Sequence, residues 1–134
     1  MKYFISNKES EYLGHTKISD EDLSKADFVI DEELFIFPGV LEGSKDLNKL
    51  LSDIKRVCKK DCQIVINVIN IYQVFVDVAF HRIDVGMGHL VCKGIENPFN
   101  IPAITNLLRS NGFIIRTTGL EDQSKFIRIE CYND

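Results

Sequence analysis

Three carboxylates stand where predicted strands end, and they are the first candidates for chemistry. Asp20, Asp31 and Glu42 each fall at such a position. Open α/β sheets bind their ligands outside the carboxyl ends of the strands, so these side chains could hold a small molecule or exchange a proton with it. The alternative is that all three are solvated loop acids, which is the common state of Asp and Glu. The sequence leaves both interpretations open.

Histidine supplies the other candidate acid–base group. His81 and His89 flank Gly86 and Gly88, a glycine pair that we expect to break the surrounding pattern and form a loop. A histidine can act as a general base near neutral pH. Neither histidine has an acid or a nucleophile at motif spacing, so a role without chemistry is the alternative. We retain His89 beside Glu42 as a candidate catalytic residue, and we expect no metal site because no residues have metal-ligand spacing.

The composition is that of an ordinary globular domain. The 134 residues are 45% hydrophobic and 27% charged, which fits one domain over residues 1–134. The formal net charge of −4 disfavours nucleic acid as a partner, and neither a signal peptide nor a membrane span is evident. Four cysteines lack CxxC or zinc-ligand spacing, which indicates free thiols in a reducing, cytoplasmic environment: Cys58, Cys62, Cys92 and Cys131.

One stretch, residues 44–70, organises the predicted fold. Apolar residues at spacings of three or four predict a helix over residues 44–59, with Ser44 as its N-cap. Residues 62–69 are apolar and mostly β-branched without alternation, which is typical of a strand covered on both faces in a parallel sheet. A helix that leads into such a strand is half of a βαβ unit.

The flanking segments extend this unit into a sheet. We expect a turn or one helical turn at residues 19–25, a helix at 101–111, and strands at 2–6, 15–19, 26–31, 34–37, 113–117 and 126–131. The loop of about seven residues between the last two strands suits an antiparallel pair. The predicted fold class is therefore α/β, with a Rossmann-like, mostly parallel sheet and an antiparallel C-terminal hairpin.

Residues 71–85 fit either a helix or a strand. Under helical spacing, apolar residues including Tyr72, Phe75 and Phe80 form one stripe, and under strand spacing Val74, Val76, Val78 and Phe80 alternate. With either spacing, the segment contains more apolar residues than one strand and its covering helix need. We therefore predict a homodimer or a tight complex with another protein, with Tyr72, Phe75 and Phe80 at the contact. The alternative is that this segment completes the core of the monomer.

The order of these elements resembles a known family. The run LEGSKDLNKLLSDIKRVCKKDCQIVINV, residues 41–68, resembles the fourth helix and fifth strand of small class I S-adenosylmethionine-dependent methyltransferases. The segment IPAITNLLRSNGF, residues 101–113, resembles the helix and Gly-Phe element of the same family, and the last two strands resemble its closing hairpin. The resemblance covers roughly residues 26–131. It implies a Rossmann-like fold and methyl transfer from S-adenosylmethionine.

The sequence departs from the family at the cofactor site. The resemblance implies a glycine-rich turn after the first strand, but residues 7–14, NKESEYLG, contain no GxG and are too few for a helical crossover, so the N-terminal part looks truncated. The resemblance also matches Asp20 to the acid that holds the ribose and Asp31 to the acid near the adenine. A rival alignment, with residues 26–34 on the fourth strand, removes both matches.

Two functions follow from this pattern. The chain is either a diverged methyltransferase-like domain, which moves a methyl group from S-adenosylmethionine to an unknown acceptor, or a non-catalytic module of the same fold that binds another protein. Because residues 7–14 present side chains where the family presents bare backbone, we expect S-adenosylmethionine to bind weakly or not at all.

Overall fold

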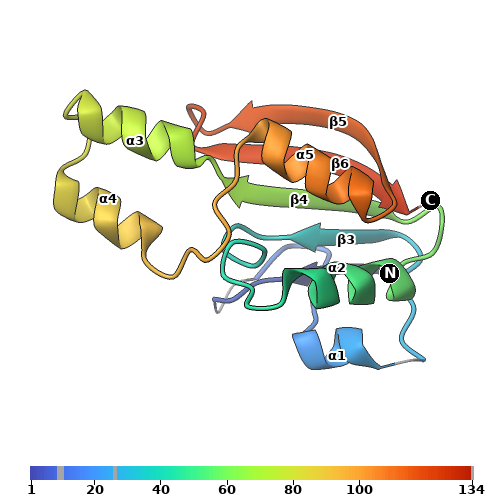
Figure 1. The fold of residues 1–134 in the computed structure, drawn as a ribbon. Coiled ribbons are helices and arrows are strands. Elements are labelled where there is room, and N and C mark those ends of the chain that lie inside the picture. Colours follow the sequence, from blue (N-terminus) through green and yellow to red (C-terminus); the bar gives the residue numbers. More distant parts are fainter. Residues whose placement is uncertain (9–10, 26, 134) are drawn as a thin grey trace.

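The fold is a six-stranded mixed sheet with five helices, seen in a computed structural model that describes residues 1–8, 11–25 and 27–133 (Figure 1). The strand order is β2-β1-β3-β4-β6-β5, and only β6 runs antiparallel to its neighbours. The strands are β1 (Lys2–Ile5), β2 (Thr16–Lys17), β3 (Glu33–Ile36), β4 (Gln63–Ile69), β5 (Phe113–Glu121) and β6 (Phe126–Asn133). The helices are α1 (Asp20–Ser24), α2 (Leu47–Val57), α3 (Ile71–Ala79), α4 (Val85–Cys92) and α5 (Ile101–Ser110). The predicted α/β class, with a mostly parallel sheet and a C-terminal antiparallel pair, is confirmed.

The helix and strand predicted at residues 44–70 are α2 and β4. β4 lies between β3 and β6, so it is an inner strand as expected. The prediction of Ser44 as N-cap is wrong, because the chain is still in a turn there, with the Ser44 amide donating to Leu41 O at 3.3 Å. The N-cap is Asp46, whose side chain accepts a hydrogen bond from the Lys49 amide at 3.1 Å.

The helices cover the two faces of the sheet unequally. α2 and α5 lie against one face, and α1 packs beside α2 (Figure 1). Their apolar stripes join the inward-facing strand residues in one large core cluster. The opposite face carries a second, small cluster of Phe4, Phe35 and Val65, with Phe37 packed against it. The ring of Tyr12 covers part of this cluster, with its centroid 4.8 Å from that of Phe35. Among the described residues, this face is covered by side chains rather than by a helix.

The N-terminal third differs most from expectation. The predicted strand at residues 26–31 is wrong where it is described, because only Ile30 pairs there, in an isolated bridge with Cys58, and Ala26 lies outside the described residues. The strand predicted at 15–19 shortens to β2, since Ser19 instead caps α1 through a capping box with Asp22. The described residues between β1 and β2 form bends and turns rather than a helix, in agreement with the short crossover.

Residues 71–85 are helical, which settles the ambiguity of the sequence. α3 covers Ile71–Ala79, and Asp84 then caps α4 by accepting a hydrogen bond from the Met87 amide. The expected break at Gly86 and Gly88 is wrong, because both glycines lie inside α4. A side chain at Gly88 would place its Cβ 2.7 Å from Cγ2 of Val78, so glycine allows the two helices to approach closely.

The C-terminal hairpin is longer than predicted. β5 continues to Glu121, so the loop shrinks to a tight turn over residues 122–125. Asp122, Gln123 and Ser124 all have positive φ there, a conformation that lets the two strands pair along their full length.

Candidate active site at the carboxyl edge

A cavity of about 1020 Å³ lies outside the carboxyl ends of the parallel strands. Its floor comes from the segments that follow β1, β3 and β4, and α3 and α4 form a wall over it. The lining of this wall is largely apolar and includes Val74, Ile83, Met87, Leu90 and Val91. Open α/β folds bind small molecules at this edge, and the volume is at the upper end of small-molecule sites. We call this space the carboxyl-edge cavity.

Glu42 is the buried acid of the cavity lining. The turn after β3 carries it, and only 1% of the residue is exposed. Its Oε2 atom accepts a hydrogen bond from the Gly39 amide at 3.0 Å and another from the Ile69 amide at 2.8 Å. The side chain therefore ties the turn after β3 to the end of β4. Its Oε1 atom is buried and has no hydrogen-bond partner among the described residues.

The environment of Glu42 favours the protonated carboxyl group. Burial raises its pKa above the ordinary value of 4.5, and the hydrogen bonds from Ile69 and Gly39 oppose that effect without cancelling it. A buried polar atom without a partner is costly, and a ligand that carries an N–H or O–H group would remove that cost at Oε1. A carboxyl group with a raised pKa can also accept and release a proton closer to neutral pH.

Charged groups surround the rest of the cavity. Lys8, Lys93 and Lys125 belong to the lining and are exposed, so cations mark its border. Asp77 of α3 is 8% exposed and accepts hydrogen bonds from Gln73 at 2.8 Å and from Arg82 at 3.3 Å. The site therefore combines an apolar wall, a cationic border and a single acid with an unsatisfied oxygen.

The segment after β1 is where the resemblance implies a glycine-rich turn that binds the cofactor. Asn7 lines the cavity there, and its side chain donates a hydrogen bond to Gly39 O at 3.0 Å, so it bridges the ends of β1 and β3. A glycine turn would leave bare backbone at this place. The unpartnered Oε1 of Glu42 and the cavity volume fit S-adenosylmethionine, which carries several N–H and O–H donors. The bridge by Asn7 places a side chain beside the end of β1.

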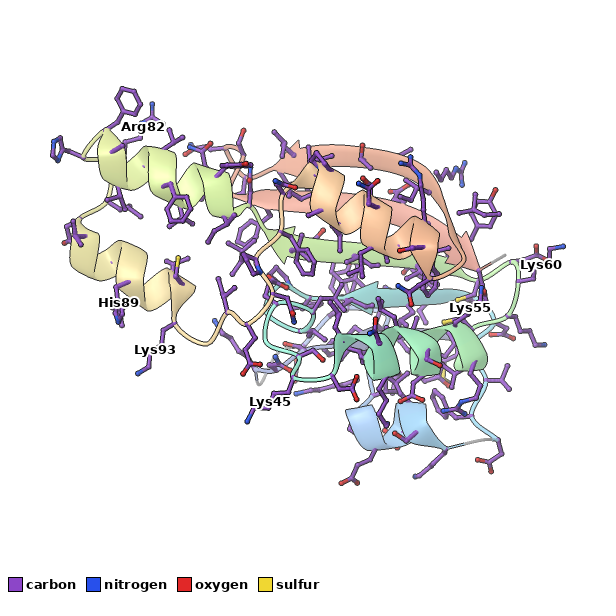
Figure 2. All side chains as sticks on the ribbon, viewed as in Figure 1. Lys45, Lys55, Lys60, Arg82, His89 and Lys93 are labelled. Carbon is purple, nitrogen blue, oxygen red and sulfur yellow. The ribbon has the colours of Figure 1, made fainter. Side chains whose placement is uncertain are left out.

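The sequence candidates are scattered rather than gathered. Glu42 is in the cavity, whereas Asp31 precedes β3 and lies at the opposite, amino edge, where its carboxylate is 3.5 Å from the N-terminal amine. The expectation that Asp31 ends a strand at the carboxyl edge is wrong, because the strand predicted before it did not form. Asp20 begins α1, just after β2, and its side chain lies outside what the structure describes. His89 points away from the molecule on α4 (Figure 2).

Sequence reasoning missed Asn7 and Asp77. A signal existed for both: Asn7 is the polar residue directly after a predicted strand, and Asp77 is the lone acid in an apolar run. Gly43 lies in the turn after β3, and a Cβ there would lie 3.0 Å from Gly39 O, so the tight turn favours glycine at this position. No three acidic, cysteine or histidine residues in the described ranges gather in a way that could hold a metal ion. None of the helices within those ranges has the length and apolar character to cross a membrane.

Comparison of the structure with solved structures identifies many methyltransferases. A magnesium protoporphyrin IX methyltransferase from Synechocystis PCC 6803, solved with bound SAH, is 12% identical with a TM-score of 0.57. The mitomycin 7-O-methyltransferase is 16% identical with a TM-score of 0.62. An S-adenosylmethionine-dependent methyltransferase from Mesorhizobium loti is 14% identical with a TM-score of 0.60. No protein-family model and no curated protein sequence matches the chain.

These matches cover a larger share of this chain than of the solved proteins. The first two cover 90% of this chain, and the third covers 98%. In turn, this chain spans 52% and 34% of the first two proteins and 81% of the third. At such identities the likeness establishes the fold, and it confirms at that level the resemblance inferred from residues 26–131. The chain therefore has the fold of class I S-adenosylmethionine-dependent methyltransferases.

Proposed function

We propose that this chain is a methyltransferase-like domain that binds a small molecule in the carboxyl-edge cavity, with Glu42 as its central polar contact. The observation that carries the proposal is the unpartnered, buried Oε1 of Glu42 in the lining of that cavity. The methyltransferase fold of the solved structures supports methyl transfer as the reaction. Four free thiols are consistent with a reducing compartment, so we place the domain in the cytoplasm.

The chemistry of the lining defines the class of acceptor. Apolar side chains from α3 and α4 favour an apolar molecule, the lysines at the border favour an anionic group on it, and Glu42 favours an O–H or N–H donor. S-adenosylmethionine, when bound, supplies an electrophilic methyl group. In its ionised form, Glu42 would accept a hydrogen bond from the acceptor and take its proton as that oxygen or nitrogen becomes methylated. The apolar wall would hold acceptor and donor in line and exclude water.

The affinity for S-adenosylmethionine is expected to be low. The side chain of Asn7 and its hydrogen bond to Gly39 O stand where the resemblance implies bare glycine backbone. This same observation favours a second candidate function, a non-catalytic module of the same fold that binds protein. The two candidates differ in whether the cavity accepts the cofactor at all.

Calorimetric titration with S-adenosylmethionine separates them. Methyl transfer predicts measurable binding of S-adenosylmethionine, weaker than the low micromolar range, and binding of the acceptor that is lost in Glu42→Ala. Asp31→Ala is the matched control, because Asp31 is an exposed acid at the amino edge and its removal should leave binding unchanged. Absence of binding at millimolar ligand would favour the non-catalytic module. A dissociation constant in the low micromolar range would contradict the role given to Asn7.

The amides of Gly39 and Ile69 provide an independent readout. Both donate to Glu42 Oε2, so their NMR shifts report on the carboxylate without requiring turnover. Small phenols and amines that carry a carboxylate are suitable probes of the acceptor class. We expect them to move these two amides, and to move them less in Glu42→Gln. Unchanged shifts with every such probe would refute Glu42 as the ligand contact.

A further inference from the structure

The first turn of α3 places a second acceptor oxygen in the lining of the carboxyl-edge cavity. Gln73 lies in that turn, after the N-cap Asn70, and it is half-buried and lines the cavity. Its Nε2 atom donates a hydrogen bond to Oδ1 of Asp77 at 2.8 Å. A carboxylate accepts hydrogen bonds and donates none, so the amide nitrogen rather than the amide oxygen must face Asp77. The Oε1 atom of Gln73 therefore points away from Asp77, and no described residue donates to it.

Asp77 is the residue that fixes the amide of Gln73 in this orientation. It is 8% exposed, and the same Oδ1 atom accepts a second hydrogen bond from Arg82 at 3.3 Å. The backbone carbonyl of Asp77 also accepts from the Arg82 amide at 2.8 Å, so the carboxylate is held at the end of the helix. Asp77 thus acts through Gln73, as a positioning residue.

Gln73 and Glu42 are both attached to the junction between β4 and α3. Oε2 of Glu42 accepts from the amide of Ile69, the last residue of β4, at 2.8 Å. Asn70 follows directly, and its carbonyl accepts from the Gln73 amide at 3.1 Å. Both side chains line the same cavity, and each has one oxygen that receives no hydrogen bond from the described residues: Oε1 of Glu42 and Oε1 of Gln73.

Two acceptor oxygens at one place call for a ligand group with at least two hydrogens. The lysines of the lining are exposed at its border, so they leave this inner part to acceptors. A hydroxyl group has one hydrogen to donate, whereas an ammonium group has three. An ammonium group would also compensate the charge of ionised Glu42, which a neutral hydroxyl group cannot do in a buried site.

We propose that the methyl acceptor is the nitrogen of a primary amine, which donates one hydrogen to Oε1 of Glu42 and another to Oε1 of Gln73. This inference rests on the proposed function and narrows its acceptor atom from oxygen or nitrogen to nitrogen. The ammonium group gives one proton to ionised Glu42, and the lone pair so freed forms the new N–C bond. The electron pair of the broken C–S bond stays on the sulfur of the methyl donor. Gln73 keeps its hydrogen bond to the nitrogen and so determines the specificity.

Three probes of equal shape test the number of hydrogens that the site accepts. Para-aminomethylbenzoate, para-hydroxymethylbenzoate and para-methylbenzoate share a ring and a carboxylate and differ only in the group that would face Glu42. In titrations followed by calorimetry, we expect the amine to bind about tenfold more tightly than the alcohol, the equivalent of one further hydrogen bond. We expect para-methylbenzoate to bind most weakly. Equal affinities of the amine and the alcohol would overturn the nitrogen acceptor.

Gln73→Met tests the specificity residue, because methionine keeps the length of the side chain and removes its oxygen. The amine should lose its advantage over the alcohol, and the affinity for para-methylbenzoate should stay the same, which shows that the cavity is intact. Gln63→Met is the matched control, since Gln63 begins β4 at the opposite edge of the sheet and should leave all three affinities unchanged. An advantage of the amine that survives Gln73→Met would overturn the role of Gln73.

Asp77→Asn tests the positioning. An asparagine amide can face Gln73 with its nitrogen or its oxygen, so the orientation of Gln73 is no longer fixed, and we expect the advantage of the amine to shrink. A full advantage in Asp77→Asn would contradict that role. The NMR shifts of the Gly39 and Ile69 amides separate this inference from the proposed function. If the amine and the alcohol move both amides but bind equally, only the nitrogen acceptor fails. If neither probe moves them, the proposed function fails as well.

Discussion

The Oε2 atom of Glu42 lies 2.8 Å from the backbone nitrogen of Ile69, so an acid from the turn after β3 accepts the hydrogen bond at the last residue of β4. The same oxygen accepts from Gly39 in its own turn. A single buried carboxyl group thereby sets the shape of the edge at which the fold binds ligands. Its position also leaves Oε1 without a partner, which links the structural role to the proposed chemical role.

The pH dependence of stability should differ between the natural chain and Glu42→Gln. Burial raises the pKa of Glu42 in the folded chain, so the folded state binds the proton more tightly than the unfolded state. Its contribution is fully present below the ordinary pKa of 4.5 and is lost as the pH rises through the folded value. The glutamine side chain of the variant would keep an acceptor oxygen for both amides without ionising. We expect the stability of Glu42→Gln relative to the natural chain to rise between acidic and neutral pH.

Urea unfolding at a series of pH values measures this difference, and all other titrating groups cancel in the comparison. Glu42→Ala is the informative companion, because it leaves the amides of Gly39 and Ile69 without their acceptor. Each buried amide left without a hydrogen-bond partner lowers the free energy of unfolding by about 1–3 kcal/mol. Parallel pH profiles for the natural chain and Glu42→Gln would show that the carboxyl group is not perturbed.

Asn7→Gly should tighten the binding of S-adenosylmethionine. The substitution removes the side chain that bridges to Gly39 O and restores bare backbone after β1. We expect a gain of about tenfold in affinity, the equivalent of one hydrogen bond that no longer competes with the ligand. Calorimetry measures the change. Asn97→Gly is unsuitable as a control, because the side chain of Asn97 itself donates hydrogen bonds to Leu41 O and Ser44 O. Asn48→Gly, an exposed position on α2, controls for the general effect of a new glycine. A looser complex in Asn7→Gly would mean that Asn7 assists binding.

Leu51→Ala should destabilise the fold by about 2–5 kcal/mol, because Leu51 is 1% exposed in the core between α2 and the sheet. Leu13→Ala is the control, since Leu13 is 99% exposed and its truncation should change the free energy of unfolding by less than about 0.5 kcal/mol. Chemical denaturation compares the two. Equal effects would place Leu51 outside the cooperative core.

Gly88→Ala should loosen the contact between α3 and α4. The new Cβ would lie 2.7 Å from Cγ2 of Val78, and such overpacking costs about 1–3 kcal/mol. Gly86→Ala lies in the same helix, but its Cβ would approach only the Asp84 side chain, at 3.3 Å. Both variants replace a helical glycine, so the difference between them in melting temperature isolates the contact with Val78. A Gly88→Ala variant as stable as Gly86→Ala would show that the helices are not held closely.

Hydrogen exchange should be slowest in the centre of β4. Val65 and Ile66 pair with β3 on one side, residues 65–68 all pair with β6 on the other, and the apolar members of this stretch are buried. Amides of an inner strand open only with the whole domain. Those of β2, a two-residue edge strand, serve as the comparison. Fast exchange at Val65 to Val68 would contradict the sheet order.

The sequence predicted the elements whose pattern is local and strong. The apolar spacing from Leu47 to Val57 and the β-branched run of β4 identified the central unit, and Pro102 and Gly112 marked the ends of α5. The helix over residues 71–79 could not be decided, because nearly every position is apolar and so both periods fit. Its exposure on one face and cavity contact on the other are properties of the tertiary fold.

The site was harder to predict because it depends on which edge of the sheet each residue reaches. Glu42 was identified as a candidate because a turn follows β3. Asp31 was misplaced because residues 26–31 look like a strand, yet Ile30 only bridges to Cys58 and the strand begins at Glu33. Asn7 gained its importance from the Gly39 carbonyl, 32 positions away. A contact of that sequence separation has no local signature.

The nine residues of α3 separate the cavity from the outer surface by the width of a single helix. Gln73, Val74 and Asp77 line the cavity, whereas Tyr72, Phe75 and Phe80 on the opposite face are exposed. A ligand that fixes the helix from the inside would therefore also restrain its outer side. Occupancy of the cavity would then be readable at side chains that never contact the ligand.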